Sequence, residues 1–400
     1  MTSTTQVRHN ETEVAHSDRW VGVGRSSAQD AYTAGTAAAK EALAGRSASL
    51  LLVFASDHYD LEAVLAGIND SSGDAPLIGC STAGEIATDG PEDTSIVVTA
   101  MGGHGFSVKT AVAHGASKDL RRSGTTVAQC FESNDEHPHQ VLLLLTDGLA
   151  GDQAEILRGI YEVTGASVPL VGGCAGDDLK MKATHQFHGR EVMSDAVVAA
   201  ALSSKAPLGI GVRHGWRAIG EPMLVTKSEG NHVYSLDNRP ALDVYLERLA
   251  PPPDVHHDPE AFTRFAITHP LGLDRRSAEA QVRFIGEANF EERSLICIAE
   301  VPRSGMVWLM EGDAESVLEA TDAACHDALL GIERPLGVVA FDCIARRGVL
   351  GDLGIKSEVD RIAMHANGAP VAGFYTYGEI ARTKGVTGFH NQTLVVLAIG

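Results

Sequence analysis

Three runs of consecutive apolar residues constrain the fold of this chain more than any other feature. They are SLLLVFAS at 49–56, VLLLLTDG at 141–148 and LGVVAFDCIARR at 336–347. A short continuous apolar run is typical of a strand that is buried on both faces within a parallel sheet. Each run is followed by a stretch with the periodicity of a helix. The sequence therefore predicts strand–helix units whose sheets are covered on both sides.

A glycine loop recurs after these strand–helix pairs. It reads PLIGCSTAGEI at 76–86 and PVAGFYTYGEI at 370–380, with Pro, Gly, Gly, Glu and Ile at identical spacing. A looser copy, VPLVGGCAGDDL at 168–179, is one residue shorter between its glycines and has Asp177 in place of glutamate. Each unit thus reads strand, helix, strand, glycine loop, acidic residue, strand. We predict a mixed α/β fold with internally repeated units, because the spacing is too irregular for a solenoid.

The length of the chain predicts more than one core. Its 400 residues exceed the roughly 100 to 200 residues of a single domain. We expect a flexible tail over 1–19 and a two-part fold, with one half at 20–225 and the other at 226–400. The polar, proline-rich stretch APPPDVHHDP at 250–259 is either a linker or a loop at a domain edge.

Charge and cysteine usage exclude several classes of protein. With 52 acidic and 32 basic residues the chain has a formal charge of −20, which would repel nucleic acid and anionic membranes. No apolar run approaches the roughly 18 residues that span a bilayer, and the polar N-terminus lacks the apolar segment of a signal peptide. The six cysteines form no CxxC pair. We expect reduced thiols in a cytoplasmic protein.

The glycine loops are candidate binding sites. Successive backbone N–H groups in such a loop cradle a carboxylate or phosphate, because glycine allows close approach. The adjacent carboxylates of Glu85, Asp177 and Glu379 would then meet an ammonium group, so a zwitterion such as an amino acid would fit. The alternative is structural: the glycines form ordinary turns, and the acids cap helices or face solvent.

Further candidate ligand-binding residues lie near these loops. Tyr377 and Glu379 are expected to line a pocket, since aromatic side chains with polar tips suit a site that is partly apolar; packing on alternate strand faces is the other interpretation. Asp147 and Asp342 end apolar strands at the edge where α/β proteins commonly bind ligands, and each equally suits a helix cap. Arg346 would pair with a ligand carboxylate or with these acids.

Enzyme motifs are largely missing from the sequence. GxxxxGK[ST], GxSxG and HExxH do not occur, and VGVGRSS at 21–27 lacks the third glycine of a dinucleotide site. Cys80 and Cys174 lie in glycine loops, where a lowered thiol pKa would allow a thiol-dependent hydrolase or transferase. Small buried thiols are the alternative interpretation. We therefore expect a protein that is not an enzyme.

Several motifs together resemble the FIST family, which is named from F-box and intracellular signal transduction proteins. The resemblance runs from about residue 20 to the end of the chain. The motifs are GCSTAGEI, LLTDGLAGDQAEIL, VPLVGGCAGDDL, LDNRPALDVYLERL, AFDCIARRGVLG, PVAGFYTYGEIA and HNQTLVV. The resemblance implies a FIST N-terminal domain followed by a FIST C-terminal domain. It also implies a role in bacterial intracellular signal transduction as a sensor of small ligands, for which amino acids are the usual proposal.

The resemblance also implies a second kind of ligand. Some members of the family are haem-binding nitric-oxide sensors that act on a histidine kinase. A haem iron needs an axial ligand, and none of the 17 histidines stands out in the sequence. Because the chain has no kinase signature and no long heptad run, we expect a stand-alone sensor that acts through a separate partner, with haem sensing as the alternative.

Overall fold

The computed structural model describes residues 19–273, 281–382 and 388–400 and has the predicted mixed α/β fold. Three stretches of the chain share one order of elements. The first contains β1 (Trp20–Ser26), α2 (Ala31–Leu43), β2 (Leu50–Ser56), α3 (Leu61–Ser72), β3 (Leu77–Thr82), β4 (Glu85–Ala87), β5 (Gly90–Glu92) and β6 (Ile96–Gly102). The second contains β7 (Phe106–His114), α4 (Leu120–Ala128), β8 (His139–Thr146), α5 (Gln153–Thr164), β9 (Leu170–Cys174), β10 (Gln186–His188), β11 (Glu191–Met193) and β12 (Ala196–Ser204).

The third stretch begins with β13 (Leu208–Arg213) and resumes after an insertion. Its remaining elements are α8 (Ala314–Ala328), β22 (Gly337–Cys343), α9 (Ile344–His365), β23 (Val371–Thr376), β24 (Glu379–Arg382), β25 (Phe389–His390) and β26 (Leu394–Ile399). The three predicted apolar runs form β2, β8 and β22. Each of these strands pairs in parallel with the strand that leads into a glycine loop, β3, β9 or β23.

The short hairpin after each glycine loop pairs with a neighbouring sheet and not with its own. The hairpin β4–β5 extends the sheet of β23, β10–β11 extends the sheet of β3, and β24–β25 extends the sheet of β9. The resulting sheets have the orders β1-β6-β2-β3-β10-β11, β7-β12-β8-β9-β24-β25 and β13-β26-β22-β23-β4-β5. This cyclic exchange links all three sheets, so the glycine loops lie where one sheet passes into the next.

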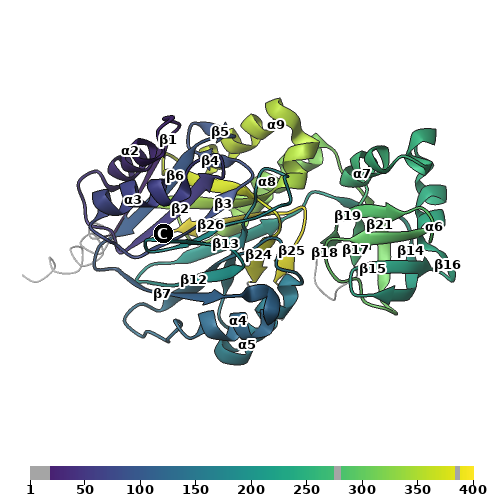
Figure 1. Ribbon diagram of the computed structural model, residues 1–400, viewed down its shortest axis with the longest axis horizontal. Helices are drawn as coiled ribbons and strands as arrows, with labels where there is room; N and C mark the ends of the chain where they lie inside the picture. Colours follow the sequence, from purple (N-terminus) through teal and green to yellow (C-terminus); the bar gives the residue numbers. More distant parts are fainter. Residues whose placement is uncertain (1–18, 274–280, 383–387) are drawn as a thin grey trace, which may run out of the picture.

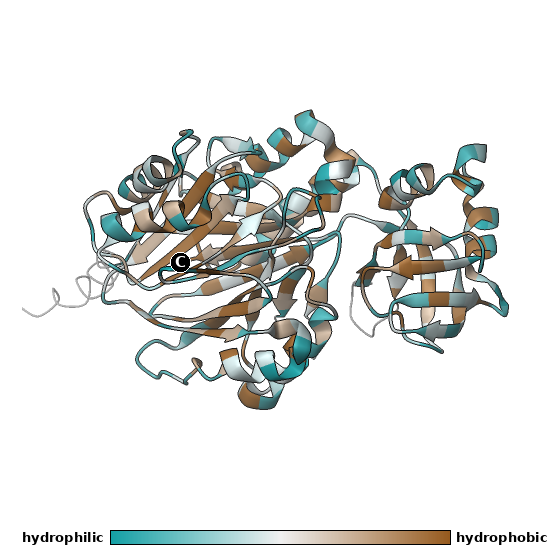
Figure 2. Cartoon of the chain, viewed as in Figure 1, coloured by the Kyte–Doolittle hydropathy of each residue, from teal (hydrophilic) through white to brown (hydrophobic). Residues whose placement is uncertain are grey.

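The three sheets share a central apolar core. Phe54, Phe341 and Phe374 meet there, and the ring centroids of Phe54 and Phe374 are 4.6 Å apart. Helix pairs cover the outer faces, with α2 and α3 on the first sheet, α4 and α5 on the second, and α8 and α9 on the third. Figure 2 shows apolar strands inside and polar residues along the outward helix faces. Burial on both faces explains why the three runs lack polar alternation.

Residues 217–311 form a second lobe, seen at the right of Figure 1. Its strands lie in the order β18-β17-β21-β14-β15-β20-β19, with β16 beside β15. Its elements are β14 (Arg217–Glu229), β15 (His232–Leu236), β16 (Arg239–Pro240), α6 (Ala241–Leu249), α7 (Pro259–Thr268), β17 (Leu271–Leu273), β18 (Gln281–Arg283), β19 (Ile285–Asn289), β20 (Ser294–Cys297) and β21 (Met306–Glu311). We call this the inserted lobe and the remainder the body.

The inserted lobe has its own core, in which Tyr245 packs against Phe262 and Phe265. The predicted break at 250–259 runs from the end of α6 to the first residue of α7 within this lobe, and the predicted division at 225/226 falls inside β14. The described helices include none long and apolar enough to cross a membrane.

Candidate functional site

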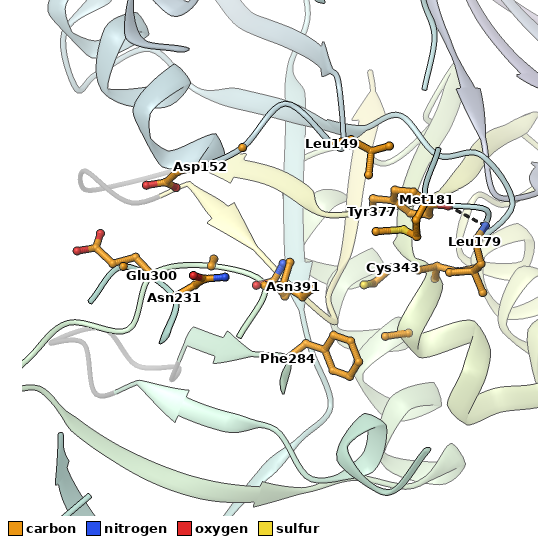
Figure 3. Close-up of a pocket in the computed structure, with 17 residues that line it drawn as sticks. Leu149, Asp152, Leu179, Met181, Asn231, Phe284, Glu300, Cys343, Tyr377 and Asn391 are labelled. Carbon is orange, nitrogen blue, oxygen red and sulfur yellow. Dashed lines mark hydrogen bonds between the residues drawn. The ribbon is translucent and has the colours of Figure 1, made fainter. Parts of the chain in front are cut away.

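A cavity of about 510 Å³ lies between the body and the inserted lobe (Figure 3). On the body side it is lined by Leu149 after β8, by Cys343 at the end of β22 and by Tyr377 after β23. The inserted lobe contributes Phe284 and Ile298. The cavity therefore lies at the carboxyl ends of parallel strands, the edge at which open α/β sheets commonly bind ligands.

The lining is mostly apolar and carries no positive charge among the described residues. Its two charged side chains are Asp152 and Glu300. Asp152 accepts a hydrogen bond of 3.0 Å from the backbone N–H of Ala154 at the start of α5, and Glu300 lies 3.3 Å from Arg158. Both carboxylates thus already have partners. The cavity suits a small molecule with a largely apolar body.

Tyr377, predicted to line a pocket, lies in this cavity and connects two glycine loops. Its hydroxyl donates a hydrogen bond to Asp177 and accepts one of 2.7 Å from the backbone N–H of Leu179. Asp177 is buried and also accepts from the backbone N–H groups of Met181, Lys182 and Ala183. Burial acts to raise the pKa of Asp177, but these hydrogen bonds outweigh it and lower the pKa.

The loop after Asp177 has strained backbone at the mouth of the cavity. Asp178, Leu179 and Met181 have φ values of 59°, 61° and 52°, which residues other than glycine rarely adopt. Leu179 and Met181 nevertheless remain largely exposed, at 62% and 56%. Such strain persists only where surrounding bonds hold it, and here Asp177 and Tyr377 supply those bonds.

Asp147 supports the cavity from behind its lining. Its carboxylate accepts hydrogen bonds from the backbone N–H of Leu149 at 2.8 Å, the hydroxyl of Thr184 at 2.8 Å and the backbone N–H of Asp195 at 2.7 Å. Asp147 does not line the cavity itself. It holds the loop that places Leu149 there, and it is not a helix cap, because Asp152 caps α5.

Glu85 and Glu379 have matching surroundings and lie outside the cavity lining. Glu85 accepts hydrogen bonds from the hydroxyl of Thr82 and from the backbone and hydroxyl of Ser95. Glu379 accepts from Thr376 at 2.6 Å and from the backbone and hydroxyl of Thr393. Burial raises the pKa of Glu85 to about 8 and that of Glu379 to about 7 against the opposing effect of these bonds. Each glutamate thus ties a hairpin to the strand that follows it.

The counterpart of these glutamates in the second stretch is Gln186, and not Asp177 as the loop alignment indicated. Glu85, Glu379 and Gln186 each open a hairpin and lie opposite Phe374, Gly173 and Cys80, which are the fifth residues of the three loop motifs counted from their prolines. The Oε1 atom of Gln186 accepts a hydrogen bond of 3.1 Å from Ala196. Glu85 and Gln186 each accept a bond from the residue ten positions later, whereas Glu379 accepts one from Thr393, fourteen positions later, so no fixed spacing in the sequence identified Gln186.

Arg346, in the first turn of α9, lies in a buried ion-pair network between α9 and α8. Its guanidinium contacts Asp342 at 2.8 Å and Glu358, and it donates to Thr321 and to the carbonyl of His214. Arg346 is fully buried and does not line the cavity. The sequence left open whether Arg346 pairs with a ligand carboxylate or with a nearby acid. In the structure it pairs with the acid Asp342. Ligand binding by Glu85, Glu379 and Arg346 stays a prediction that no contact with the cavity supports.

The two loop thiols lack the properties of a nucleophile. Cys80 and Cys174 are buried. Burial is the main cause that raises the pKa of Cys80 well above its ordinary value. Burial likewise raises the pKa of Cys174 to about 12, although the hydroxyl of Thr146 donates a hydrogen bond to its sulfur. A reactive cysteine needs the thiolate, which these surroundings disfavour.

The donors of the cavity are a poor match for haem iron, which is usually held by histidine, cysteine thiolate, methionine or tyrosine. No histidine occurs among the lining residues that the structure describes. Burial and the nearby Glu379 raise the pKa of the Cys343 thiol well above its ordinary value. The hydroxyl of Tyr377 is already engaged by Asp177 and Leu179. Met181 alone is left as an axial donor, so the lining does not fit a haem held by histidine or thiolate.

Comparisons with known proteins cover nearly the whole chain. A family model of the FIST N domain matches residues 49–239, and one of the FIST C domain matches residues 241–382. A Mycobacterium tuberculosis protein described as uncharacterized is 27% identical over 396 residues, spanning 93% of this chain and 97% of the relative. An uncharacterized Mycobacterium bovis protein is 24% identical over the same shares of the two chains. An uncharacterized Methanocaldococcus jannaschii protein is 24% identical over 348 residues, which are 79% of this chain and 66% of the relative.

Proposed function

The chain belongs to the FIST family, whose domains are sensory signal-transduction domains, and from this premise we propose that it binds a small organic ligand between the body and the inserted lobe. The observation that carries the proposal is the cavity of about 510 Å³ shared by these two parts. A ligand there contacts loops of two separate apolar cores. Its binding energy therefore biases the position of one part relative to the other.

This coupling supplies a sensory output. A ligand shifts a conformational equilibrium only through a difference in its affinity for the two states. A molecule that bridges Leu149 on the body and Ile298 on the inserted lobe binds the closed arrangement better than an open one. We propose that a separate signalling protein, such as a histidine kinase, binds the surface that this shift changes. None of the six cysteines, all within the described residues, forms a disulfide bond, which supports a cytoplasmic location for this signalling.

We propose binding without catalysis, because the loop thiols lack the surroundings of a nucleophile. An amino acid remains one candidate ligand. Its carboxylate, however, would find no lysine, arginine or histidine among the described lining residues. The apolar lining instead favours a ligand whose affinity comes from buried apolar surface.

Hydrogen exchange measured by mass spectrometry tests the proposal. The protein is screened against a mixture of metabolites that includes the amino acids, and exchange is compared with and without each ligand found. Protection is expected together at residues 148–152 on the body and 298–300 on the inserted lobe, because both line the cavity. Protection confined to one part, or located away from the cavity, would contradict a ligand that bridges them.

A further inference from the structure

The chemistry of the cavity points to a narrower ligand class, an inference that rests on the proposed function. We infer that the ligand is uncharged and largely apolar, and that it donates an N–H hydrogen bond to Asn391. Two independent features of the lining carry this assignment. The first is an amide oxygen that lacks a protein partner, and the second is the distribution of charge.

Asn391 is a buried polar side chain in the wall of the cavity. It lies in the loop between β25 and β26, is 2% exposed and appears among the lining residues in Figure 3. Its Oδ1 atom has no hydrogen-bond partner among the described residues. Buried polar groups in folded proteins nearly always have a partner, because an unpaired one loses its hydration without compensation. The oxygen has almost no surface open to solvent, so a donor on the ligand satisfies it once the Asn391 side chain turns toward the cavity.

The charge of the lining excludes an anionic group next to Asn391. Asp152 and Glu300 are the only charged side chains among the described lining residues, and both are negative. A ligand carboxylate would be desolvated without a cation to pair with it. Glu300 is already paired with Arg158, whereas Asp152 keeps its charge because its partner is a neutral backbone N–H; an ammonium group is therefore drawn toward Asp152 and away from Asn391. A neutral N–H donor, as in a carboxamide, meets both conditions.

The apolar part of the lining defines the body of the ligand. Phe284, Leu149 and Ile298 surround the space from both sides of the cavity. Ile298, like Leu179 at the mouth, keeps much of its surface exposed, at 45%. Covering these side chains with an apolar ligand removes that surface from water. The geometry thus combines an apolar slot with one polar anchor, the usual composition of a specific small-molecule site.

Four related probes separate these features. They are 3-phenylpropanamide, which is uncharged with an N–H donor; methyl 3-phenylpropanoate, which is uncharged without one; 3-phenylpropanoate, which is an anion; and L-phenylalanine, which is a zwitterion. Dissociation constants are measured by ligand-observed NMR titration of the full chain. The amide is expected to bind roughly three- to tenfold more tightly than the other three, a ratio typical of one good hydrogen bond.

Substitution at Asn391 tests the anchor itself. Asn391→Leu is expected to weaken binding of the amide about tenfold and to leave the ester unchanged. The matched control is Gln392→Leu, which removes a neighbouring buried amide that also has an unpaired oxygen but does not line the cavity. Thermal unfolding of both variants verifies that they fold.

The outcomes distinguish this inference from the proposed function. The assignment of an uncharged N–H donor would be overturned if L-phenylalanine or the anion bound as tightly as the amide or more tightly. It would also be overturned if Asn391→Leu left binding of the amide unchanged. Either result would retain the cavity as a ligand site. Failure of all four probes to bind would overturn both the assignment and the proposed site.

Discussion

The hydroxyl of Tyr377 donates a hydrogen bond to the carboxylate of Asp177 and so joins two glycine loops that are 200 residues apart in sequence. The same hydroxyl accepts the backbone N–H of Leu179, and Asp177 accepts three further N–H groups from 181–183. The loop that carries Leu179 and Met181 at the cavity mouth is therefore fixed by one phenol and one carboxylate. Its strained backbone gives this pair a function in shaping the cavity.

Tyr377→Phe tests that relationship. The variant keeps the ring but removes both hydrogen bonds of the hydroxyl, so we expect a loss of about 1 to 3 kcal/mol in the free energy of unfolding and faster amide exchange at 178–183. Tyr32→Phe is the matched control, since its hydroxyl makes an exposed hydrogen bond to Asp70. Unchanged exchange in the loop of the Tyr377 variant would show that the phenol does not hold it.

Glu85 and Glu379 predict a specific dependence of stability on pH. Their pKa values, about 8 and about 7 in the folded protein, lie above the ordinary value of 4.5. The folded state thus binds these protons more tightly than the unfolded chain. This contribution to stability is full below about pH 4.5 and is lost as the pH rises through 7 and 8. The loss amounts to roughly 1.4 kcal/mol for every pH unit that separates the folded pKa from the unfolded one.

The double variant Glu85→Gln and Glu379→Gln tests this pH dependence. Gln186 already occupies the equivalent position in the second stretch, so glutamine is expected to fit at the other two. Chemical denaturation from pH 5 to pH 9 should show the stability of the wild type declining relative to the variant. Parallel curves for the two proteins would mean that the glutamates do not titrate in this range.

Arg346 is expected to be a stability residue. Arg346→Met leaves the buried acids Asp342 and Glu358 without their cation, and breaking such a network costs about 3 to 5 kcal/mol. Lys356→Met on the same helix removes an exposed pair with Asp360 and should cost less than about 1 kcal/mol. Equal losses for both variants, measured by chemical denaturation, would contradict the central role of Arg346 in the network.

The loop thiols are predicted to be unreactive in the folded protein. Burial and the raised pKa values of Cys80 and Cys174 disfavour the thiolate at neutral pH. Labelling with iodoacetamide followed by peptide mass spectrometry should modify both residues only after denaturation. Rapid modification of either one in the native protein would revive a thiol-dependent enzyme.

The buried strands were predictable from sequence because their cause is local. An apolar run such as 49–56 has no polar face to present to solvent, so it forms a strand buried on both faces whichever strands it pairs with. The exchange of hairpins was not predictable, since the pairing of Glu85 with Phe374 depends on packing between segments nearly 300 residues apart. The inserted lobe was also missed as a unit. Apart from β14, its described strands have at most six residues, and β14 alternates between buried and exposed positions only over Met223–Val225, which is a weaker signal.

The candidate site was predictable only in part. Tyr377 was found because aromatic residues cluster near a glycine loop, and it does line the cavity. Asn391 was missed because an isolated asparagine in a loop looks like any turn residue until its burial is known. Asp177 was matched to Glu85 by loop spacing, although Gln186 is the structural equivalent. Sequence patterns thus identified the loops but not which of their side chains face the cavity.

Native mass spectrometry of freshly purified protein shows whether the cavity between the body and the inserted lobe binds a small ligand. Ile298→Trp should block the cavity at its mouth, where the side chain is 45% exposed and replaceable, and Leu353→Trp is the control at an exposed site on α9. Wild type and Leu353→Trp are predicted to carry an added small-molecule mass, either on purification or after exposure to a metabolite extract, and Ile298→Trp to lack it. An added mass retained by Ile298→Trp, or a wild type that stays at its apo mass throughout, would contradict the claim.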